Sequence, residues 1–215
     1  FTISKRAVVW KKMKIAFIGI GNVGYAIANI LQKAGNSIII ANNNFKSDSV
    51  KSAIQKNSAF LQKTVQDAVN DAEIIFLVTP FSAIAEVLSG VKFSSKILVD
   101  CTNPIGIGLT KRKKSAMSGA EYVQELATDA KVIKAFSIYG YENFVNNQTI
   151  KDYPKPVMLI AGNDQKSKND LSKLIEPFGF FTKDAGDLSQ ALHLEHMTLL
   201  WIKMARDNSS PKNFM

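Results

Sequence analysis

The chain has 215 residues, of which 46% are hydrophobic and one is a cysteine. This length and composition exclude a long disordered polymer, and such a chain can bury a core without disulfides or a structural metal. The net charge of +9 gathers partly before Met13, and no stretch approaches the roughly 20 apolar residues of a membrane span. The sequence therefore predicts a compact domain without a membrane partner, and the single cysteine favours a reducing, cytoplasmic location.

Regular patterning begins just after Met13, so residues 1–12 are interpreted as an appended or upstream segment outside the fold. From there, short apolar runs rich in β-branched residues alternate with stretches of helical periodicity. Strands are predicted over 14–18, 37–41, 73–78, 96–100, 131–135, 156–161 and around 180–183. Helices are predicted over 23–33, from about 82, over 164–176 and over 188–205.

Near-continuous apolar strands are typical of a parallel sheet whose two faces are both covered by helices. Residues 13–186 are therefore predicted to form an α/β domain, with a doubly wound and mostly parallel sheet. A helical extension follows in residues 187–215, and its helix has apolar side chains nearly all around, so that it needs a cover. A second subunit would supply that cover, which predicts a homodimer, and loops of the same chain are the alternative.

A glycine motif stands between the first strand and the first helix. It reads Gly19-Ile20-Gly21-Asn22-Val23-Gly24, which is G-x-G-x-x-G. In this position Gly19 permits a tight turn, Gly21 leaves room for a pyrophosphate, and Gly24 lets the helix pack closely on the strand. Free amides at the helix start then bind the anion. The motif predicts a dinucleotide site in these six residues, with a phosphate-free glycine turn as the alternative.

The residues after the second strand read the 2′ position of the adenosine ribose. Asn42 and Asn43 stand where a carboxylate would select NAD, and Lys46 follows closely. Because no acid repels a 2′-phosphate here, the sequence favours NADP. NAD is the alternative, since an Asn side chain can bind either a ribose hydroxyl or a phosphate.

Two further loops follow later strands, at the edge where a doubly wound sheet opens its ligand crevice. Thr79 and Pro80 form the first loop, and Thr102, Asn103 and Pro104 form the second. Small polar residues and prolines at strand ends give rigid loops with exposed backbone groups. These loops are predicted to hold the second ribose and the nicotinamide, and ordinary turns are the alternative.

Several segments in combination resemble a known family. They are residues 15–24, the segment Asp100-Cys101-Thr102-Asn103-Pro104, residues 132–136, the pair Leu194-Glu195 and the run Leu200-Trp201-Ile202. Over residues 14–205 the chain is similar to the NADP oxidoreductases that use the deazaflavin coenzyme F-420, together with their bacterial relatives. The resemblance implies a Rossmann fold, a dimer, and a nicotinamide that lies near the loop after Asp100 and beside Phe136.

The resemblance also implies hydride transfer, and the chain is interpreted as an NADP-dependent oxidoreductase with a flavin-like or deazaflavin acceptor as co-substrate. The acceptor is expected beside Phe136, Ser137, Tyr139 and His193. Hydride transfer between stacked rings needs orientation more than acid–base help, so no catalytic residue is assigned. The alternative is a non-catalytic module that binds the dinucleotide and senses redox state.

Metal and nucleic-acid sites are not predicted. His193 and His196 lie three residues apart, but no third ligand is evident near them, and zinc normally needs three protein ligands. The basic run at residues 111–114 has no interleaved aromatic residues, so it is interpreted as a solvated loop. The predicted partners are therefore a small-molecule hydride acceptor and a second copy of the chain.

Overall fold

The computed structural model describes residues 12–105, 117–145 and 155–207. Residues 1–11 of the predicted upstream segment and the basic run at 111–114 lie outside the described residues, and so do the last eight residues. Within the described ranges, no helix has the length and apolar composition needed to cross a membrane.

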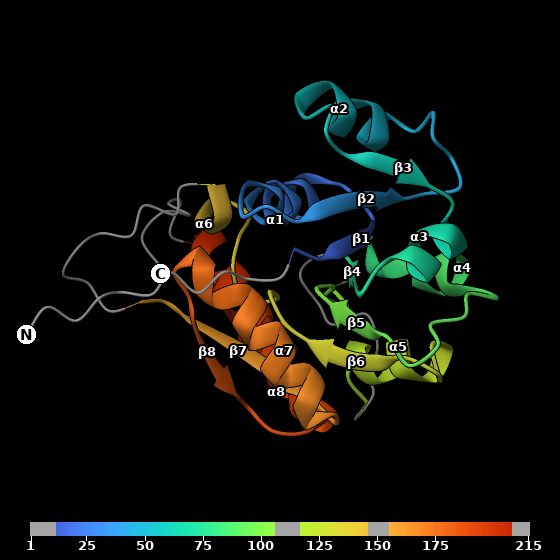
Figure 1. Cartoon of the computed structure of the whole chain (residues 1–215). Coiled ribbons are helices and arrows are strands. Elements are labelled where there is room, and N and C mark those ends of the chain that lie inside the picture. The colour runs from blue at the N-terminus through green and yellow to red at the C-terminus, as the bar shows by residue number, and fades with distance from the viewer. Residues whose placement is uncertain (1–11, 106–116, 146–154, 208–215) are drawn as a thin grey trace, which may run out of the picture.

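In the described part of the chain, eight strands form one sheet in the order β3-β2-β1-β4-β5-β6-β7-β8 (Figure 1). They are β1 (Lys14–Ile18), β2 (Ser37–Ala41), β3 (Leu61–Lys63), β4 (Ile74–Leu77), β5 (Ile97–Asp100), β6 (Lys131–Lys134), β7 (Val157–Gly162) and β8 (Phe181–Asp184). Neighbouring strands are parallel except β6 and β7, which are antiparallel. The predicted doubly wound, mostly parallel sheet is confirmed.

Helices follow most of the strands. They are α1 (Asn22–Lys33), α2 (Asp48–Lys56), α3 (Val65–Asp71), α4 (Ile84–Leu88), α5 (Gly119–Leu126), α6 (Glu142–Val145), α7 (Gln165–Ile175) and α8 (Ala191–Asp207). Short 3₁₀ turns are η1 (Phe81–Ala83), η3 (Glu176–Phe178) and η4 (Leu188–Gln190). The start of α5 is fixed by a capping box, in which Ser118 accepts from the amide of Glu121 and the Glu121 carboxylate binds the Ser118 amide.

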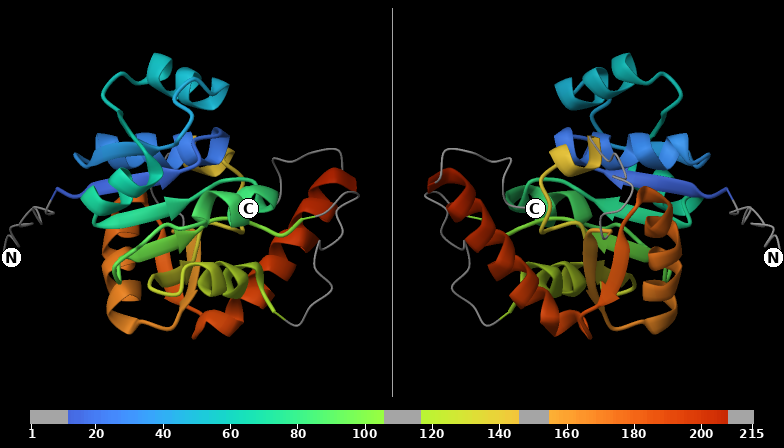
Figure 2. Two further views of the ribbon diagram at one scale, coloured as in Figure 1. Left: turned by 90° about the vertical axis from the view of Figure 1, so that its right-hand side faces the viewer. Right: turned by 90° about the vertical axis from the view of Figure 1, so that its left-hand side faces the viewer.

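The strands are buried on both faces because their side chains alternate between two apolar clusters. In β1, Ile15 and Phe17 pack into the cluster that α1, α6 and α7 cover. Ala16 and Ile18 pack into the other cluster, which α3, α4 and α5 cover. Figure 2 shows α7 and α8 on opposite sides of the sheet, with α8 beside α5. Strands with such a pattern read as continuous apolar runs in the sequence.

The last helix is covered in part by its own chain. Leu194, Glu195 and Thr198 of α8 are buried where the helix packs on α5 and β7. Met197 and Leu200 on another side of the helix are 48% and 60% exposed. The same-chain cover that was the alternative in the sequence prediction therefore accounts for one face of α8 and leaves another face open.

Candidate functional site

A cavity of about 950 Å³ lies at the edge of the sheet where the parallel strands β1, β2, β4 and β5 end. Its lining comes from residues 18–23, 41–44, 78–81 and 101–103, together with Ser49, Val65, Glu86, Val87 and Tyr141. Because the carboxyl ends of parallel strands meet at one edge, segments far apart in the chain share this cavity. The cavity is the candidate functional site.

The cavity brings together most residues of the predicted cofactor site. They are Gly19, Ile20, Gly21, Asn22, Val23, Asn42, Asn43, Thr79, Pro80, Thr102 and Asn103. Gly24, Lys46 and Pro104 of the same prediction do not line it. Gly24 is buried in α1, and Lys46 is exposed.

The three glycines of the turn face different surroundings. Gly19 has a φ of +97°, and a Cβ there would lie 2.7 Å from the carbonyl carbon and oxygen of Val78. A Cβ on Gly24 would lie 2.7 Å from the Gly19 carbonyl oxygen. A Cβ on Gly21 would meet nothing within 4 Å. The fold itself therefore requires glycine at 19 and 24, whereas position 21 opens onto free space in the cavity.

The start of α1 leaves its first amides without a side-chain acceptor. Its N-cap is Gly21, which makes no side-chain cap hydrogen bond, and the first turn carries no acidic residue. The first N–H groups of a helix have no partner within the helix, and the helix dipole is positive at this end. With the open space at Gly21, this end of α1 fits the diphosphate of a dinucleotide.

The side chains after β2 are held by local hydrogen bonds. The Asn42 Oδ1 atom accepts from the Asn44 amide at 2.7 Å, and the Asn43 Oδ1 atom accepts from the Val65 amide at 3.0 Å. The lining residues between β2 and α3 include no carboxylate. The amide of Lys46 donates to the Asn44 Oδ1 atom at 3.1 Å. Side chains of three successive asparagines therefore accept backbone hydrogen bonds in this turn.

A buried ion cluster, formed by Asp100, Lys134 and Glu195, lies next to the part of the cavity wall that contains Thr102. The Lys134 Nζ atom lies 2.9 Å from Asp100 Oδ2 and 3.3 Å from Glu195 Oε1. Burial by itself lowers the pKa of Lys134, but the charges of Asp100 and Glu195 outweigh burial and raise the pKa above its ordinary 10.5. The lysine is therefore a permanent buried cation between two carboxylates. Sequence analysis missed Lys134 and gave Glu195 no role.

The Asn103 side chain also forms part of the cavity wall. Its Nδ2 atom donates to the Ser137 carbonyl at 3.2 Å. Its Oδ1 atom is buried and has no hydrogen-bond partner among the described residues. A buried acceptor without a partner is costly unless a ligand or water supplies a donor, so Asn103 offers an acceptor to whatever occupies this end.

The four residues predicted to contact the acceptor are not brought to the lining of the cavity. Phe136 adopts a left-handed φ of +59°, and its ring packs in the core 5.7 Å from the ring of Phe76. The Tyr139 hydroxyl donates to the Val157 carbonyl at 2.8 Å. Ser137 is buried, with its carbonyl bound by Asn103. His193 is exposed on α8. In the segment between β6 and α6, Tyr141 lines the cavity.

Cys101 also lines the cavity, but its thiol is not poised to react. Burial, and then the charge of Asp100, raises the pKa of Cys101 well above its ordinary value. The thiol therefore stays protonated at neutral pH, and the thiolate is the reactive form. Among the described residues, no group of three or more His, Cys, Asp or Glu side chains could hold a metal ion.

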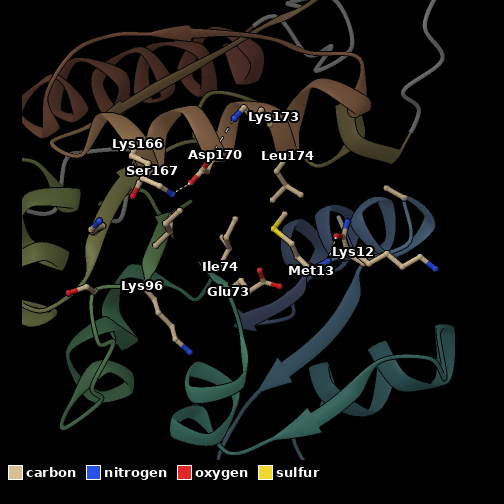
Figure 3. Close-up of a pocket in the computed structure, with 15 residues that line it drawn as sticks. Lys12, Met13, Glu73, Ile74, Lys96, Lys166, Ser167, Asp170, Lys173 and Leu174 are labelled. Carbon is tan, nitrogen blue, oxygen red and sulfur yellow. Dashed lines mark hydrogen bonds and ion pairs between the residues drawn. The ribbon is translucent and has the colours of Figure 1, made fainter. Parts of the chain in front are cut away.

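A second cavity, of about 590 Å³, lies at the amino edge of the sheet (Figure 3). Met13, Ile74 and Leu174 contribute apolar lining, and several lysines surround it. The Lys96 ammonium donates to the carbonyls of Val69 and Asn70 at 2.6 and 2.5 Å, and the Lys166 ammonium lies 2.7 Å from Asp170. The Lys96 and Lys166 ammonium groups thus already have partners, and no glycine turn of the described part of the chain lines this cavity. The cavity at the carboxyl edge is therefore the better candidate for the functional site.

Comparison with known proteins gives a family match over the same part of the chain. Residues 14–104 match the family described as NADP oxidoreductase coenzyme F420-dependent. The match spans the glycine turn, the Asn42–Asn43 segment and the Thr102–Asn103 wall. The match confirms, over these residues, the resemblance predicted from the sequence.

Solved structures share the fold over nearly the whole chain. A candidate F420-dependent NADP reductase from Arthrobacter sp. FB24 has a TM-score of 0.77 at 22% identity, covering 93% of this chain and 96% of its own. A hypothetical protein from Sinorhizobium meliloti has a TM-score of 0.74 at 25% identity, covering 85% and 88%. A reductive aminase from Aspergillus terreus, solved with NADPH4, has a TM-score of 0.64 at 16% identity, covering 93% of this chain but 63% of its own.

Proposed function

We propose that this protein transfers hydride between NADP(H) and a flavin-like or deazaflavin acceptor. One observation carries the proposal. A glycine turn with open space at Gly21, and with uncapped α1 amides, shares a cavity with the polar wall formed by Thr102 and Asn103. A dinucleotide has an anionic centre and two polar ends, which is the pattern that this cavity offers. The match of residues 14–104 to F420-dependent NADP oxidoreductases supports the same chemistry.

Each end of the cofactor would have its own binding groups in this arrangement. The first amides of α1 would hold the diphosphate. Asn42, Asn43 and Ser49 line the end that suits the adenosine ribose, and Lys46 follows as a nearby cation for a 2′-phosphate. The absence of a carboxylate from the lining after β2 favours NADP over NAD.

The nicotinamide end would be bound by the loops after β4 and β5. Thr79, Pro80, Thr102 and Asn103 line this end. The free Asn103 Oδ1 acceptor matches the N–H groups of a carboxamide. When bound, NADPH supplies a hydride, which carries two electrons and one proton, and the acceptor takes its second proton from water. The protein contributes orientation and a partly apolar wall that includes Phe81 and Val87.

The acceptor would approach beside Tyr141 rather than beside the residues expected from the sequence. Tyr141 lines the cavity together with Asn103, and its side chain is partly exposed. A planar isoalloxazine or deazaflavin ring can stack on an exposed aromatic ring. Phe136, Ser137 and Tyr139 would then support this wall from behind, without touching the acceptor.

The test is oxidation of NADPH by the purified protein with a panel of acceptors: FMN, FAD, riboflavin, the deazaflavin F-420 and a small quinone. We expect turnover with at least one flavin-like ring, and the loss of reduced-nicotinamide absorbance measures it. Gly21→Asp is the matched control, because it blocks the diphosphate site and should abolish the turnover. Tight NADPH binding without turnover on any acceptor would favour the redox-sensing module instead, and the absence of binding in calorimetry would refute both.

We further propose that the protein forms a homodimer through α8. Met197, Leu200 and Met204 are 48%, 60% and 41% exposed, and their spacing places them along one stripe of the helix. Light scattering should give twice the mass of the chain, and Leu200→Asp should give the monomer. A parent protein that stays monomeric at high concentration would contradict this proposal.

A further inference from the structure

The buried ion cluster controls the shape of the cavity wall at Thr102. The Thr102 amide and hydroxyl donate to Asp100 Oδ1 at 2.9 and 2.7 Å, and the Lys134 ammonium donates to the Thr102 carbonyl. All three polar groups of Thr102 are therefore bound to the Asp100–Lys134 pair. Because Thr102 and Asn103 line the cavity, the buried pair dictates the conformation of the wall.

Glu195 completes the cluster from a distant part of the chain. One carboxylate oxygen lies 3.3 Å from the Lys134 ammonium. The two oxygens also accept from the amides of Gly119 and Ala120, at 2.9 and 3.2 Å, at the start of α5. Without Glu195, a fully buried ammonium would keep one carboxylate, and two buried amides would lose their acceptor. Removing one partner of a buried charge cluster is strongly unfavourable.

The packing around Glu195 leaves little freedom for the carboxylate. A Cβ on Gly119 would lie 3.0 Å from Glu195 Oε1, 3.2 Å from Pro104 Cδ and 2.8 Å from the ring of Phe81. Pro104 directly follows the wall residue Asn103, and Phe81 lines the cavity. The Glu195 carboxylate, Phe81 and Pro104 therefore all pack around Gly119. A shift of α8 would move the carboxylate and with it the neighbours of the Thr102–Asn103 wall.

A second connection joins the same helix to Asn103. Thr198 lies almost one turn after Glu195, and its hydroxyl oxygen lies 3.0 Å from the Ser137 carbonyl. That carbonyl also accepts from Asn103 Nδ2 at 3.2 Å. Helix α8 therefore reaches Thr102 through Glu195 and Lys134, and it reaches Asn103 through Thr198 and Ser137.

We propose that Glu195 is a positioning residue, which holds the Thr102–Asn103 wall through Lys134 in the shape that orients the nicotinamide half of NADP(H). This inference rests on the proposed function, and it adds α8 to the cofactor site. The adenosine half binds at the other end of the cavity, after β2, where neither α8 nor the cluster contributes lining. Loss of the Glu195 charge should therefore affect one half of the cofactor and spare the other.

The test compares two ligands and turnover in Glu195→Gln, which keeps the shape of the side chain and removes its charge. The affinity for 2′,5′-ADP, which lacks the nicotinamide half, should stay as in the parent protein. The affinity for NADPH should fall toward that of 2′,5′-ADP. Turnover should fall in kcat, on the order of 10²-fold, because a small misplacement of a reacting ring has that effect. Glu195→Asp, which restores the charge, should recover part of the loss.

A matched control separates positioning from stability. Lys168 of α7 is 5% exposed and lies 2.8 Å from Asp184, in a part of the fold that does not line the cavity. Asp184→Asn should lower the melting temperature, yet it should leave the NADPH to 2′,5′-ADP affinity ratio and kcat unchanged. If Glu195→Gln does not fold, Glu195→Asp carries the same comparison, because the shorter side chain draws the carboxylate back from Lys134.

The outcomes distinguish the two proposals. A parent protein that binds neither ligand overturns the proposed function and this inference together. A parent protein that binds both, with a variant whose affinity ratio and kcat are unchanged, overturns the positioning role and leaves the proposed function standing. The affinity ratio also decides the positioning role when the parent protein binds NADPH without turnover.

Discussion

Replacement of Gly21 by Asp should raise the stability of the free protein and lower its affinity for NADPH on the order of 10²-fold. The residue has an ordinary φ of −68° as the N-cap of α1, and a Cβ there would meet nothing within 4 Å. An Asp N-cap is favoured over Gly by a few tenths of a kcal/mol. A negative charge at the helix start adds about 0.3–1 kcal/mol, and the loss of glycine's freedom in the unfolded chain adds a similar amount.

These gains sum to about 1–2 kcal/mol, and each 1 kcal/mol corresponds to a rise in Tm of roughly 2–4 °C for a chain of this size. The same carboxylate would occupy the α1 amides and face the diphosphate. Two unit charges about 4 Å apart repel by about 4 kcal/mol near a protein surface. Even with screening, a loss of about 3 kcal/mol lowers NADPH affinity on the order of 10²-fold.

Thermal unfolding with and without NADPH measures both effects, because a ligand that binds the folded state raises Tm. We expect NADPH to stabilise the parent protein and to leave the Gly21→Asp variant unchanged. Gly21→Ala adds bulk without charge and should lose less affinity. A lower Tm for free Gly21→Asp would show that the fold needs this glycine, and an unchanged NADPH affinity would refute the diphosphate site at α1.

Gly19→Ala should destabilise the protein by about 1–3 kcal/mol from its left-handed backbone alone, with more from the Val78 contact at 2.7 Å, as measured by urea unfolding; an unchanged midpoint would contradict this geometry. Lys46→Ala should weaken NADPH by about 1 kcal/mol more than NADH, and equal losses in calorimetry would show that Lys46 does not read the 2′ group. Because burial and Asp100 raise the pKa of Cys101, its contribution to stability is complete below pH 9.0, the ordinary pKa of a thiol, and is lost as the pH rises above that value. Cys101→Ala should flatten the urea midpoint in this alkaline range, and an identical pH profile would argue against the buried thiol.

The diphosphate end of the cavity could be predicted because its information is contiguous in the chain. The strand 14–18, the glycines and the helix that begins at Asn22 lie within one βαβ unit, and their patterns agree. The loops after β4 and β5 could be predicted as lining because parallel strands must end at the same edge. Geometry of this kind follows from element type and order alone.

Short elements were harder to predict. Nine residues or fewer make up each of the helices α2, α3, α5 and α6 and the strand β3. Such a short element contains too few residues to show a clear apolar periodicity. A local pattern for α5 was nevertheless present, since Ser118 and Glu121 have the spacing of a capping box. The antiparallel pairing of β6 and β7 could not be predicted either, because the connection between them is long enough for a parallel crossover.

Phe136, one of the acceptor residues expected from the resemblance, does not line the cavity, and its backbone angle accompanies this position. Phe136 directly follows the short β6–Ala135 run, and its φ of +59° accompanies a ring that packs in the aromatic core against Phe76 and Phe144. Non-glycine residues rarely adopt this region, so this angle could not be expected from the residue types. Tyr141, two residues beyond Tyr139, lines the cavity instead.

The buried cluster carried a pattern that is visible in retrospect. Asp100 and Lys134 are register partners on adjacent strands. Asp100 ends an otherwise apolar strand, Lys134 follows the apolar pair Val132-Ile133, and Glu195 stands in a helix rich in apolar residues. A charge in an apolar element is expected to find an opposite charge when it is buried. Their separations, 34 residues from Asp100 to Lys134 and 76 from Gly119 to Glu195, are tertiary information, so the pattern predicts that partners exist and not which ones they are.

The two ends of the cavity are therefore built by different means. Backbone geometry within a single turn forms the diphosphate end, and that turn needs glycine at positions 19 and 24. Charges from β5, β6 and α8 form the nicotinamide end, so its shape depends on where α8 lies. Because α8 presents Glu195 and Thr198 inward and the stripe at Met197, Leu200 and Met204 outward, a partner on that stripe would stabilise the same helix that shapes the nicotinamide end. The proposed dimer and the proposed positioning role therefore depend on one helix, and a subunit contact would reach the cofactor through its nicotinamide half.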